Sequence, residues 1–484
     1  MTAKTGQTMP PKPVRGPDLA PRRSPVSRRA LLTMLSAATL SGCATGSAYV
    51  PPAFPFLSRY ARATEVPPVL LSNSAWWQGL DDAVLNQLIA LALAGNLTLS
   101  VARERVTQAQ ATRQAVPLSA LLSPSARAQV SGSGDADPAT QSTVQLGLSW
   151  MLDPYGARRE QLRTADAQID MSAAEVDAAR LLVLFNMANA YTALRYSQRI
   201  AALAQGELDS RLQTLALTRR LADAESATRL DIIRSEARVA EIRAGLPDQD
   251  AAVSAKLNEI AVLAGLAPGT LPAALMQALG SGGQPRPGQP RPALSPQVGI
   301  PADLLRNRPD IRIAERRYYA AVAQIGVAEA ALYPSLSLTG TISLDALNGG
   351  PRSAEYFFGP VLQLPSLPLG SGRAAVEARR AAARQELEAW KSTVLSAILE
   401  VENALVDYQA VAASMQSTAQ ADRLYREALD LTRDVFERGE ATLGDLIDAQ
   451  EAVSGADRAV AAMALRHAQS FVALNVRLGA GNAG

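Results

Sequence analysis

The segment that decides the fold is residues 335–344, Ser-Leu-Ser-Leu-Thr-Gly-Thr-Ile-Ser-Leu, in which polar and apolar side chains alternate almost without error. A period of two places the leucine and isoleucine side chains on one face of a strand and the hydroxyl groups on the other. Residues 143–150 alternate in the same way, whereas residues 125–131 and 358–364 are weaker candidates, the last interrupted by Pro360. Half-buried soluble sheets also alternate, but this pattern over about ten residues is the signature of membrane β-barrels. The sequence therefore predicts four candidate membrane strands.

Two very long helices are expected after the strand pairs. About 65 residues before Ala224 and another 66 before Gly439 contain no proline. At 1.5 Å per residue each helix spans roughly 100 Å, far more than an ordinary globular helix. Apolar residues recur every seventh position over 162–190 and over 387–415, which predicts coiled-coil packing.

The mature chain contains the same unit twice. Residues 218–233 and 432–447 align at a constant offset of 214 and are identical at six of sixteen positions, where chance gives about one. A second pair, residues 99–105 and 311–317, lies at an offset of 212. A period this long indicates a tandem duplication rather than a solenoid.

Each half is expected to run through a helix, two strands, a very long helix, a turn and a returning helix. The leading helices are predicted over residues 81–115 and 309–331. Gly245-Leu246-Pro247 should interrupt and kink the first returning helix, because proline lacks a backbone donor. The predicted domains are a signal peptide (1–42), a lipid-anchored segment (43–80), a first repeat (81–279), a Gly/Pro-rich linker (280–298) and a second repeat with the C-terminal tail (299–484).

The N-terminus has the pattern of a lipoprotein signal peptide. Paired arginines precede an apolar run over residues 30–40, and Leu40-Ser41-Gly42-Cys43 resembles the lipobox of bacterial lipoproteins. That resemblance implies cleavage before Cys43, lipidation with acyl chains such as palmitate and, because Ala44 follows, sorting to the outer membrane. The run is shorter than the roughly 20 apolar residues of a membrane-spanning helix, and no later stretch is expected to form one.

Composition argues against catalysis and against nucleic-acid binding. The 484 residues include one Cys and one His, which excludes an intramolecular disulfide and leaves little for a Cys/His metal site. A net charge of +2 gives no electrostatic reason to expect a nucleic-acid partner. The phosphate-binding pattern GxxxxGK[ST] is absent from the sequence. No catalytic residue, metal or cofactor is therefore expected.

Four strands cannot close a membrane barrel alone. An open sheet edge in hydrocarbon leaves unpaired backbone groups that cost several kcal/mol each, and known barrels begin at about eight strands. The chain must therefore pool its strands with copies of itself. Two copies supply eight strands and three supply twelve, and the strand count alone leaves both open.

Several longer motifs resemble the TolC-like outer-membrane efflux proteins. They are Ile-Pro-Ala-Asp-Leu-Leu-Arg-Asn-Arg-Pro-Asp-Ile at 300–311, Gln-Ile-Gly-Val-Ala at 324–328, Ala-Leu-Tyr-Pro-Ser-Leu-Ser-Leu-Thr-Gly at 331–340, and Trp76-Trp77 followed by Asp81. The likeness is greatest to the lipoprotein branch that includes OprM, the NodT-type outer membrane factors of RND efflux systems. It covers almost all of residues 70–480.

The resemblance implies a mainly α fold with transmembrane β structure. Three copies would form a twelve-stranded barrel in the outer membrane and a periplasmic α-helical barrel about 100 Å long. The implied function is a passive exit channel for drugs and other small toxic solutes. Its implied partners are outer-membrane lipid, a periplasmic adaptor (membrane fusion) protein and an RND-type inner-membrane pump, with the chain lipid-anchored on the periplasmic side.

The resemblance also assigns roles to the turns that end the long helices. They are expected to contact the adaptor and to narrow into a gate. Asp445 and Asp448 match the acidic ring of that gate, and Asp231 is the repeat-related position; charges favoured by the helix dipole are the alternative explanation. The adaptor-contact candidates are Ala227, Thr228, Gly439, Ala441 and Thr442.

The two turns also depart from the family pattern. Glu225 stands where the second turn has Gly439, so the first turn must close without glycine. The second turn has no arginine at the position that cross-links the gate, and Arg438 or Arg229 would have to replace it.

Two other functions fit parts of the sequence. One is the outer-membrane channel of a type I protein-secretion system, which has the same architecture. The other is a periplasmic coiled-coil lipoprotein that forms no channel and therefore conducts no ions. An enzyme is disfavoured, because no nucleophile–base set, metal cluster or phosphate loop supports it.

Overall fold

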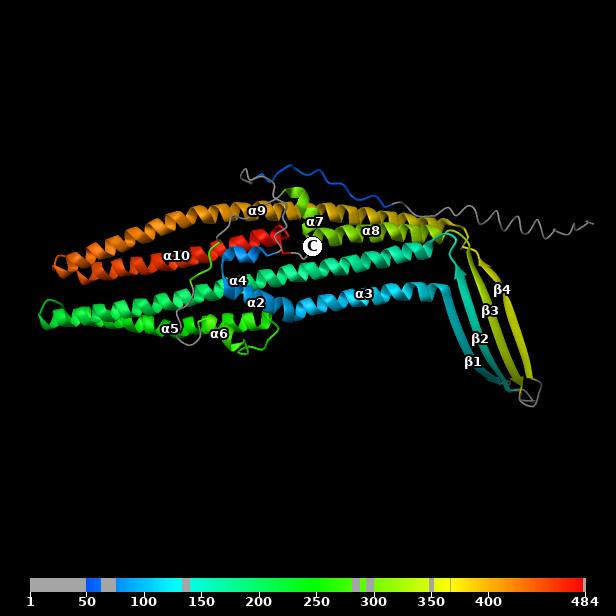
Figure 1. Cartoon of the computed structure of the whole chain (residues 1–484), viewed down its shortest axis with the longest axis horizontal. Coiled ribbons are helices and arrows are strands. Elements are labelled where there is room, and N and C mark those ends of the chain that lie inside the picture. Colours follow the sequence, from blue (N-terminus) through cyan, green and yellow to red (C-terminus); the bar gives the residue numbers. More distant parts are fainter. Residues whose placement is uncertain are drawn as a thin grey trace, which may run out of the picture. The chain divides into compact units, whose positions relative to one another are not determined.

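Two helices of nearly equal length dominate the structure, a computed structural model that describes residues 49–61, 75–132, 140–280, 288–292, 300–347, 352–365 and 367–481. Helix α4 (Ala157–Asp223) has 67 residues and α9 (Gly370–Glu437) has 68. Each turns into a returning helix of 35 residues, α5 (Arg229–Leu263) and α10 (Leu443–Arg477) (Figure 1). The two long helical hairpins predicted from the proline-free stretches are confirmed.

The four strands form one antiparallel sheet in the order β1-β2-β3-β4. They are β1 (Leu122–Gly132), β2 (Thr140–Leu152), β3 (Ser335–Leu347) and β4 (Arg352–Gln363). All four predicted strands are therefore confirmed, and each is longer than its alternating core. Pro360 lies in β4, opposite Leu338 of β3. Strand β4 is at the edge of this sheet, where a residue without a backbone N–H donor is tolerated.

The two halves repeat one element order. Helix α3 (Leu97–Leu121) leads into the first strand pair and the first long hairpin, and α8 (Pro309–Ala330) leads into the second pair and hairpin. Helix α4 packs against α3, α5, α8 and α10, and α9 packs against α8 and α10. The seven-residue repeat lies in these seams, since Val183, Val394 and Val401 are fully buried.

The first leading helix differs from the prediction, whereas the second, α8, confirms it. The continuous helix expected over residues 81–115 is wrong, because Asn96 divides it into α2 (Ala83–Gly95) and α3. The Asn96 side chain accepts a hydrogen bond from Leu99 N at 3.1 Å and donates to Leu263 O at 2.8 Å. Asparagine is a strong helix N-cap, so it starts a new helix and ties that start to α5.

The same region contains a segment long and apolar enough to span a membrane by composition. Residues Ala83–Val116 reach a mean hydropathy of 1.6 over an 18-residue window, so the expectation of no such segment was too strict. However, Leu85, Leu88 and Ile89 are at most 1% exposed inside the protein. Part of the apolar surface of this segment therefore lies in the protein core, and 33% of the apolar window is buried.

Proline does not end the first returning helix. Pro247 lies inside α5, which continues from Arg229 to Leu263. The expected interruption is therefore wrong, and a kink at this position stays a prediction.

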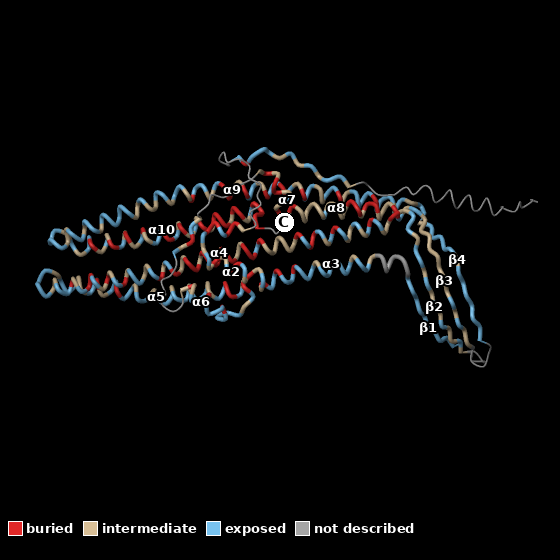
Figure 2. Tube along the Cα trace, in the orientation of Figure 1, coloured by how far each residue is buried: buried red, intermediate tan, exposed pale blue. Residues whose placement is uncertain are grey.

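The main hydrophobic core lies midway along the long helices, where shorter elements pack against them. It combines the 3₁₀ turn η1 (Trp76–Leu80) and α6 (Ala273–Ala278) with buried residues of α2, α4, α5 and α10. Arg195 of α4 is 1% exposed and donates to the Leu279 carbonyl at 3.4 Å and to Tyr191 Oη at 2.9 Å. Figure 2 shows that burial concentrates here and along the seams, whereas the far ends of the hairpins are largely exposed.

A second core cluster joins α7 (Leu304–Asn307), which follows the turn η2 (Pro301–Asp303), to α9 and to residues 49–61. Tyr60 is 1% exposed there, and Phe54 meets Trp390 edge to face at 6.2 Å. The segment after the predicted lipidation site is thus held against the helices by aromatic side chains. Cys43 and the signal peptide lie outside the described residues, as does most of the predicted linker 280–298.

Candidate functional site

Two turns close the helical hairpins at the end that lies away from the sheet (Figure 1). We call residues 224–228 the first tip and residues 438–442 the second tip. In the first, Ser226 N donates to Leu221 O at 2.8 Å; in the second, Glu440 N donates to Val435 O at 3.0 Å. Both are Schellman motifs, in which the backbone of the residue after the helix cap is left-handed.

The left-handed position is occupied by different residues in the two tips. Gly439 has φ of 78°, and Glu225 has φ of 55°. The prediction that the first turn closes without glycine is confirmed. A residue with a Cβ pays about 1–2 kcal/mol for this conformation, so the first tip is the more strained of the two.

Two of the three predicted gate carboxylates are built into helix caps. The Asp231 carboxylate accepts hydrogen bonds from Thr228 N at 3.0 Å and Thr228 Oγ1 at 2.7 Å, and Asp445 does the same with Thr442 at 2.8 and 2.6 Å. These threonine hydrogen bonds hold the pKa of each carboxyl below its ordinary value. Both groups therefore carry a fixed negative charge at the mouth of the hairpins, together with a capping role.

The third candidate, Asp448, is exposed one helical turn beyond Asp445. Its charge contributes to a raised pKa of Arg238 on α5, after the larger effects of Glu241 and Glu451. Asp448 therefore lies close enough to Arg238 of the neighbouring hairpin to interact with it electrostatically. A ring of carboxylates requires several copies of the chain, so the gate role of all three residues stays a prediction.

The tip surface is available for contact. Thr228, Gly439 and Thr442 are exposed, and Ala227 and Ala441 are partly exposed. Arg438, a candidate cross-link, approaches Glu440 within its own tip at 3.8 Å, with both side chains more than half exposed. A pair this exposed contributes little to stability and leaves the arginine able to exchange partners.

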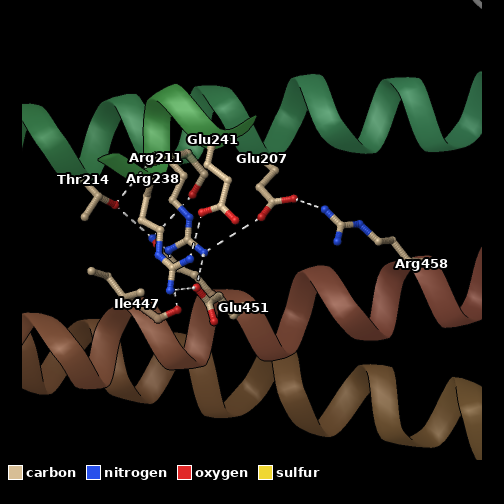
Figure 3. Close-up of polar contacts among 10 residues, drawn as sticks. Glu207, Arg211, Thr214, Arg238, Glu241, Ile447, Glu451 and Arg458 are labelled. Carbon is tan, nitrogen blue, oxygen red and sulfur yellow. Dashed lines mark hydrogen bonds and ion pairs between the residues drawn. The ribbon is translucent and has the colours of Figure 1, made fainter. Parts of the chain in front are cut away.

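Behind the tips, a buried polar cluster joins the two hairpins (Figure 3). We call it the Arg211 network. Arg211 of α4 is 4% exposed and donates to Gln450 Oε1 of α10 at 2.7 Å. Gln450 Nε2 in turn donates to Thr214 Oγ1 at 3.0 Å. On either side, Arg238 pairs with Glu451 at 3.0 Å and Arg458 with Glu207 at 2.5 Å.

The buried guanidinium of Arg211 has two carboxylate neighbours that favour its charged form. Burial lowers the pKa of the Arg211 guanidinium, and the neighbouring carboxylates Glu207 and Glu451, each 3.9 Å from it, oppose that shift. The cation remains charged and bridges both hairpins. The sequence-based predictions do not include this network, although the sequence carries a signal for it: Arg211 continues the seven-residue series that begins at Leu162.

The sheet has two chemically different faces. Cross-strand partners in the register share a face, and one face carries rows such as Ala126, Leu146, Ile342 and Tyr356. The opposite face carries rows such as Arg127, Gln145, Ser343 and Glu355. On this polar face Thr143 Oγ1 donates to Asp345 Oδ1 at 2.5 Å, and the hydroxyls of Ser149 and Thr339 lie 3.3 Å apart.

Comparison with known proteins shows which family has this architecture. The family model "Outer membrane efflux protein" matches residues 88–266 and 300–480. Nodulation protein T of Rhizobium leguminosarum bv. trifolii is 34% identical over 456 residues, which cover 91% of this chain and 95% of the relative. The pyoverdine export outer membrane protein OpmQ of Pseudomonas aeruginosa is 30% identical over 431 residues, covering 84% and 87%. The solved outer-membrane channel OprN superposes with a TM-score of 0.79 at 28% identity, covering 90% of this chain and 99% of that one.

Proposed function

Since the chain belongs to the outer membrane efflux protein family, we propose that three copies of it form the exit duct of a tripartite efflux system. The protein is an outer-membrane efflux channel with a long periplasmic extension, and its family and fold are those of channels rather than of enzymes. The proposed partners are a periplasmic adaptor and an RND-type inner-membrane pump. The pump supplies the energy, and this chain supplies the passage.

The observation that carries the proposal is the two-faced sheet. Leu146, Ile342 and Phe358 are 57%, 54% and 74% exposed on one face, which is costly in water and favourable against lipid. The edges β1 and β4 pair with no further strand among the described residues. Hydrocarbon does not tolerate unpaired edges, so the edges must pair with those of neighbouring copies. Three copies then close twelve strands around a polar lumen.

The cargo proposed for this duct is small, amphipathic and toxic, in keeping with a polar lumen wall and with relatives such as OpmQ, whose name specifies pyoverdine export. The proposed lipid anchor at Cys43 holds the periplasmic side of the chain to the outer membrane. At the far end, the tips are the proposed adaptor contact, and Asp445 with Asp448 are the proposed selectivity ring.

The test is the native mass of the mature protein extracted from outer membranes in detergent, followed by planar-bilayer conductance. We expect three copies per particle and discrete, cation-selective channels. A monomer that stays soluble without detergent would remove the barrel and leave the lipid-anchored coiled-coil scaffold. A trimer that conducts only in the presence of a translocating polypeptide would favour the type I secretion channel.

A further inference from the structure

The polar face of the sheet carries one aromatic residue among the described strands. Phe357 of β4 pairs with Thr341, which pairs with Gly147, which pairs with Ser125, so all four lie on the polar face. The other aromatic residues of the described strands, Trp150, Tyr356 and Phe358, lie on the opposite, apolar face by the same register. Phe357 is therefore the one aromatic side chain that these strands direct to the polar side.

The Phe357 ring stands over small residues. Its side chain is about half exposed, at 52%. Its ring leans along the strand over Gly359, because a Cβ added at Gly359 would lie 3.4 Å from Phe357 Cζ. Across the sheet, Thr341 and Gly147 are small, and Gly147 has Ser125 Oγ close above it. No large neighbour on β2 or β3 covers the ring.

The position along the strand is also informative. Phe357 lies near the middle of β4, and its partner Thr341 lies at the middle of β3. On one side of the ring, the flanking row of the polar face contains the charged residues Arg127 and Glu355. On the other side, Gly359 and Thr339 separate the ring from Val361. A half-exposed aromatic ring thus stands at mid-strand on a mainly hydrophilic wall.

We propose that Phe357 is a cargo-contacting and size-limiting residue of the duct. This rests on the proposed function, in which the polar face lines the lumen of a closed trimer. Three copies of the ring then project into the lumen at mid-height of the barrel, above a wall of hydroxyl groups and glycine. Such a ring offers π faces and edges to flat aromatic or apolar parts of a solute, while the hydroxyl groups keep the polar parts hydrated. The ligand class is an amphipathic aromatic cation or zwitterion.

The adjacent phenylalanine provides a matched control. Phe358 has the same side chain and lies on the same strand, but its register partner Gly340 places it on the lipid-facing side. A Cβ at Gly340 would lie 3.3 Å from Phe358 Cδ2, so that ring packs on the apolar face. Equal truncation at 357 and at 358 therefore separates a lumen effect from a general loss of aromatic surface.

The experiment uses the full-length trimer in planar bilayers, with the variants Phe357→Ala, Phe357→Leu, Phe357→Trp and Phe358→Ala. Single-channel conductance is expected to rise in Phe357→Ala and fall in Phe357→Trp by tens of per cent, and to stay unchanged in Phe358→Ala. Block by tetraphenylphosphonium, an aromatic cation, should weaken roughly threefold to tenfold in Phe357→Ala and Phe357→Leu. Block by the aliphatic tetrabutylammonium should change much less.

The competing role for Phe357 is packing against the next copy across the closing seam. Unchanged conductance and unchanged block in Phe357→Ala trimers would overturn the proposal. So would failure of both Phe357→Ala and Phe357→Leu to assemble while Phe358→Ala assembles normally, because that result assigns Phe357 to the seam. A wild-type protein that forms no channel would instead refute the proposed function itself.

Discussion

Replacing Arg211 with methionine should loosen the packing between the two helical hairpins near their tips. Methionine keeps most of the apolar stem and removes only the guanidinium. The loss includes the 2.7 Å hydrogen bond to Gln450 Oε1 and a weaker one, at 3.5 Å, to the carbonyl of Ile447. Gln450 is 6% exposed, so its freed oxygen gains little from water.

The magnitude follows from the burial of the two partners. A hydrogen bond from a charged group contributes about 1.5–3 kcal/mol, and a buried acceptor left unsatisfied costs about 1–3 kcal/mol. The contacts of Arg211 with Glu207 and Glu451 are both 3.9 Å long, beyond hydrogen-bond distance. Glu451 is 43% exposed, and Glu207 keeps its contact with Arg458, so we assign the main cost to Gln450. Because Gln450 keeps its bond to Thr214, we expect a net cost of about 2–3 kcal/mol in local opening.

The assay is amide hydrogen exchange of the detergent-solubilised trimer. A cost of 2–3 kcal/mol corresponds to exchange roughly 30- to 150-fold faster in the part of α10 around Gln450. The control is Arg458→Met, which breaks a pair at the rim of the same network whose arginine is 53% exposed, and it should change exchange by less than about fivefold. Peptides from α8 should exchange as in the wild type. Equal protection in the two variants would refute the reasoning, because it would mean that burial of Arg211 adds nothing to the hairpin contact.

Other predictions concern the tips and the anchor. The double change Asp445→Ala, Asp448→Ala should reduce cation selectivity or increase leak in planar bilayers, and unchanged conductance and selectivity would remove these residues from the gate. In the wild type, cation selectivity should persist as the pH is lowered below the ordinary aspartate pKa of about 3.9, because the pKa of Asp445 is lowered. The contribution of this cap to the free energy of unfolding depends on pH in the same direction. It is present above the pKa that the Asp445 carboxyl has in the unfolded state, and it is lost as the pH falls through the lower pKa of the folded state, which acid unfolding would measure. Gly439→Ala should destabilise its turn by about 1 kcal/mol, because alanine is strained in the left-handed conformation. Glu225→Gly should be neutral or slightly stabilising, since relief of the left-handed strain is offset by the higher chain entropy of glycine in the unfolded state. The rates of proteolysis at the two tips would measure both effects. Cys43→Ala should lose the lipid yet still need detergent, because the strands supply their own membrane contact, and a fully water-soluble variant would contradict this.

Most of the architecture could be predicted because it depends on short-range patterns of polar and apolar residues along the sequence. A period of two marks a strand regardless of what the strand pairs with, so all four strands were identified before their order was known. Long proline-free, alanine-rich stretches with a seven-residue repeat have few alternatives to long packed helices. The Thr-x-x-Asp sequences at 228–231 and 442–445 place helix starts for the same local reason.

The candidate site was less predictable, because its properties depend on partners far away in sequence. Asp231 and Asp445 lie at the hairpin tips, and their hydrogen bonds to the cap threonines show a structural role, whereas their gate role stays a prediction. The break at Asn96 depends on its contact with Leu263, which no pattern near Asn96 reports. The Arg211 network was missed for the same reason, since Gln450 lies 239 residues away.

By itself, the sequence determined the elements, the duplication and the chemical contrast between the two sheet faces, because side-chain spacing along one strand or helix sets these properties. Only the tertiary structure decided which elements meet. The α4–α10 seam needs Arg211 and Gln450 to be buried together, and burial is a property of the packed pair rather than of either helix. Likewise, any two successive strand residues point to opposite faces, but only the register with Thr341 and Gly340 assigned Phe357 to the polar face and Phe358 to the apolar one.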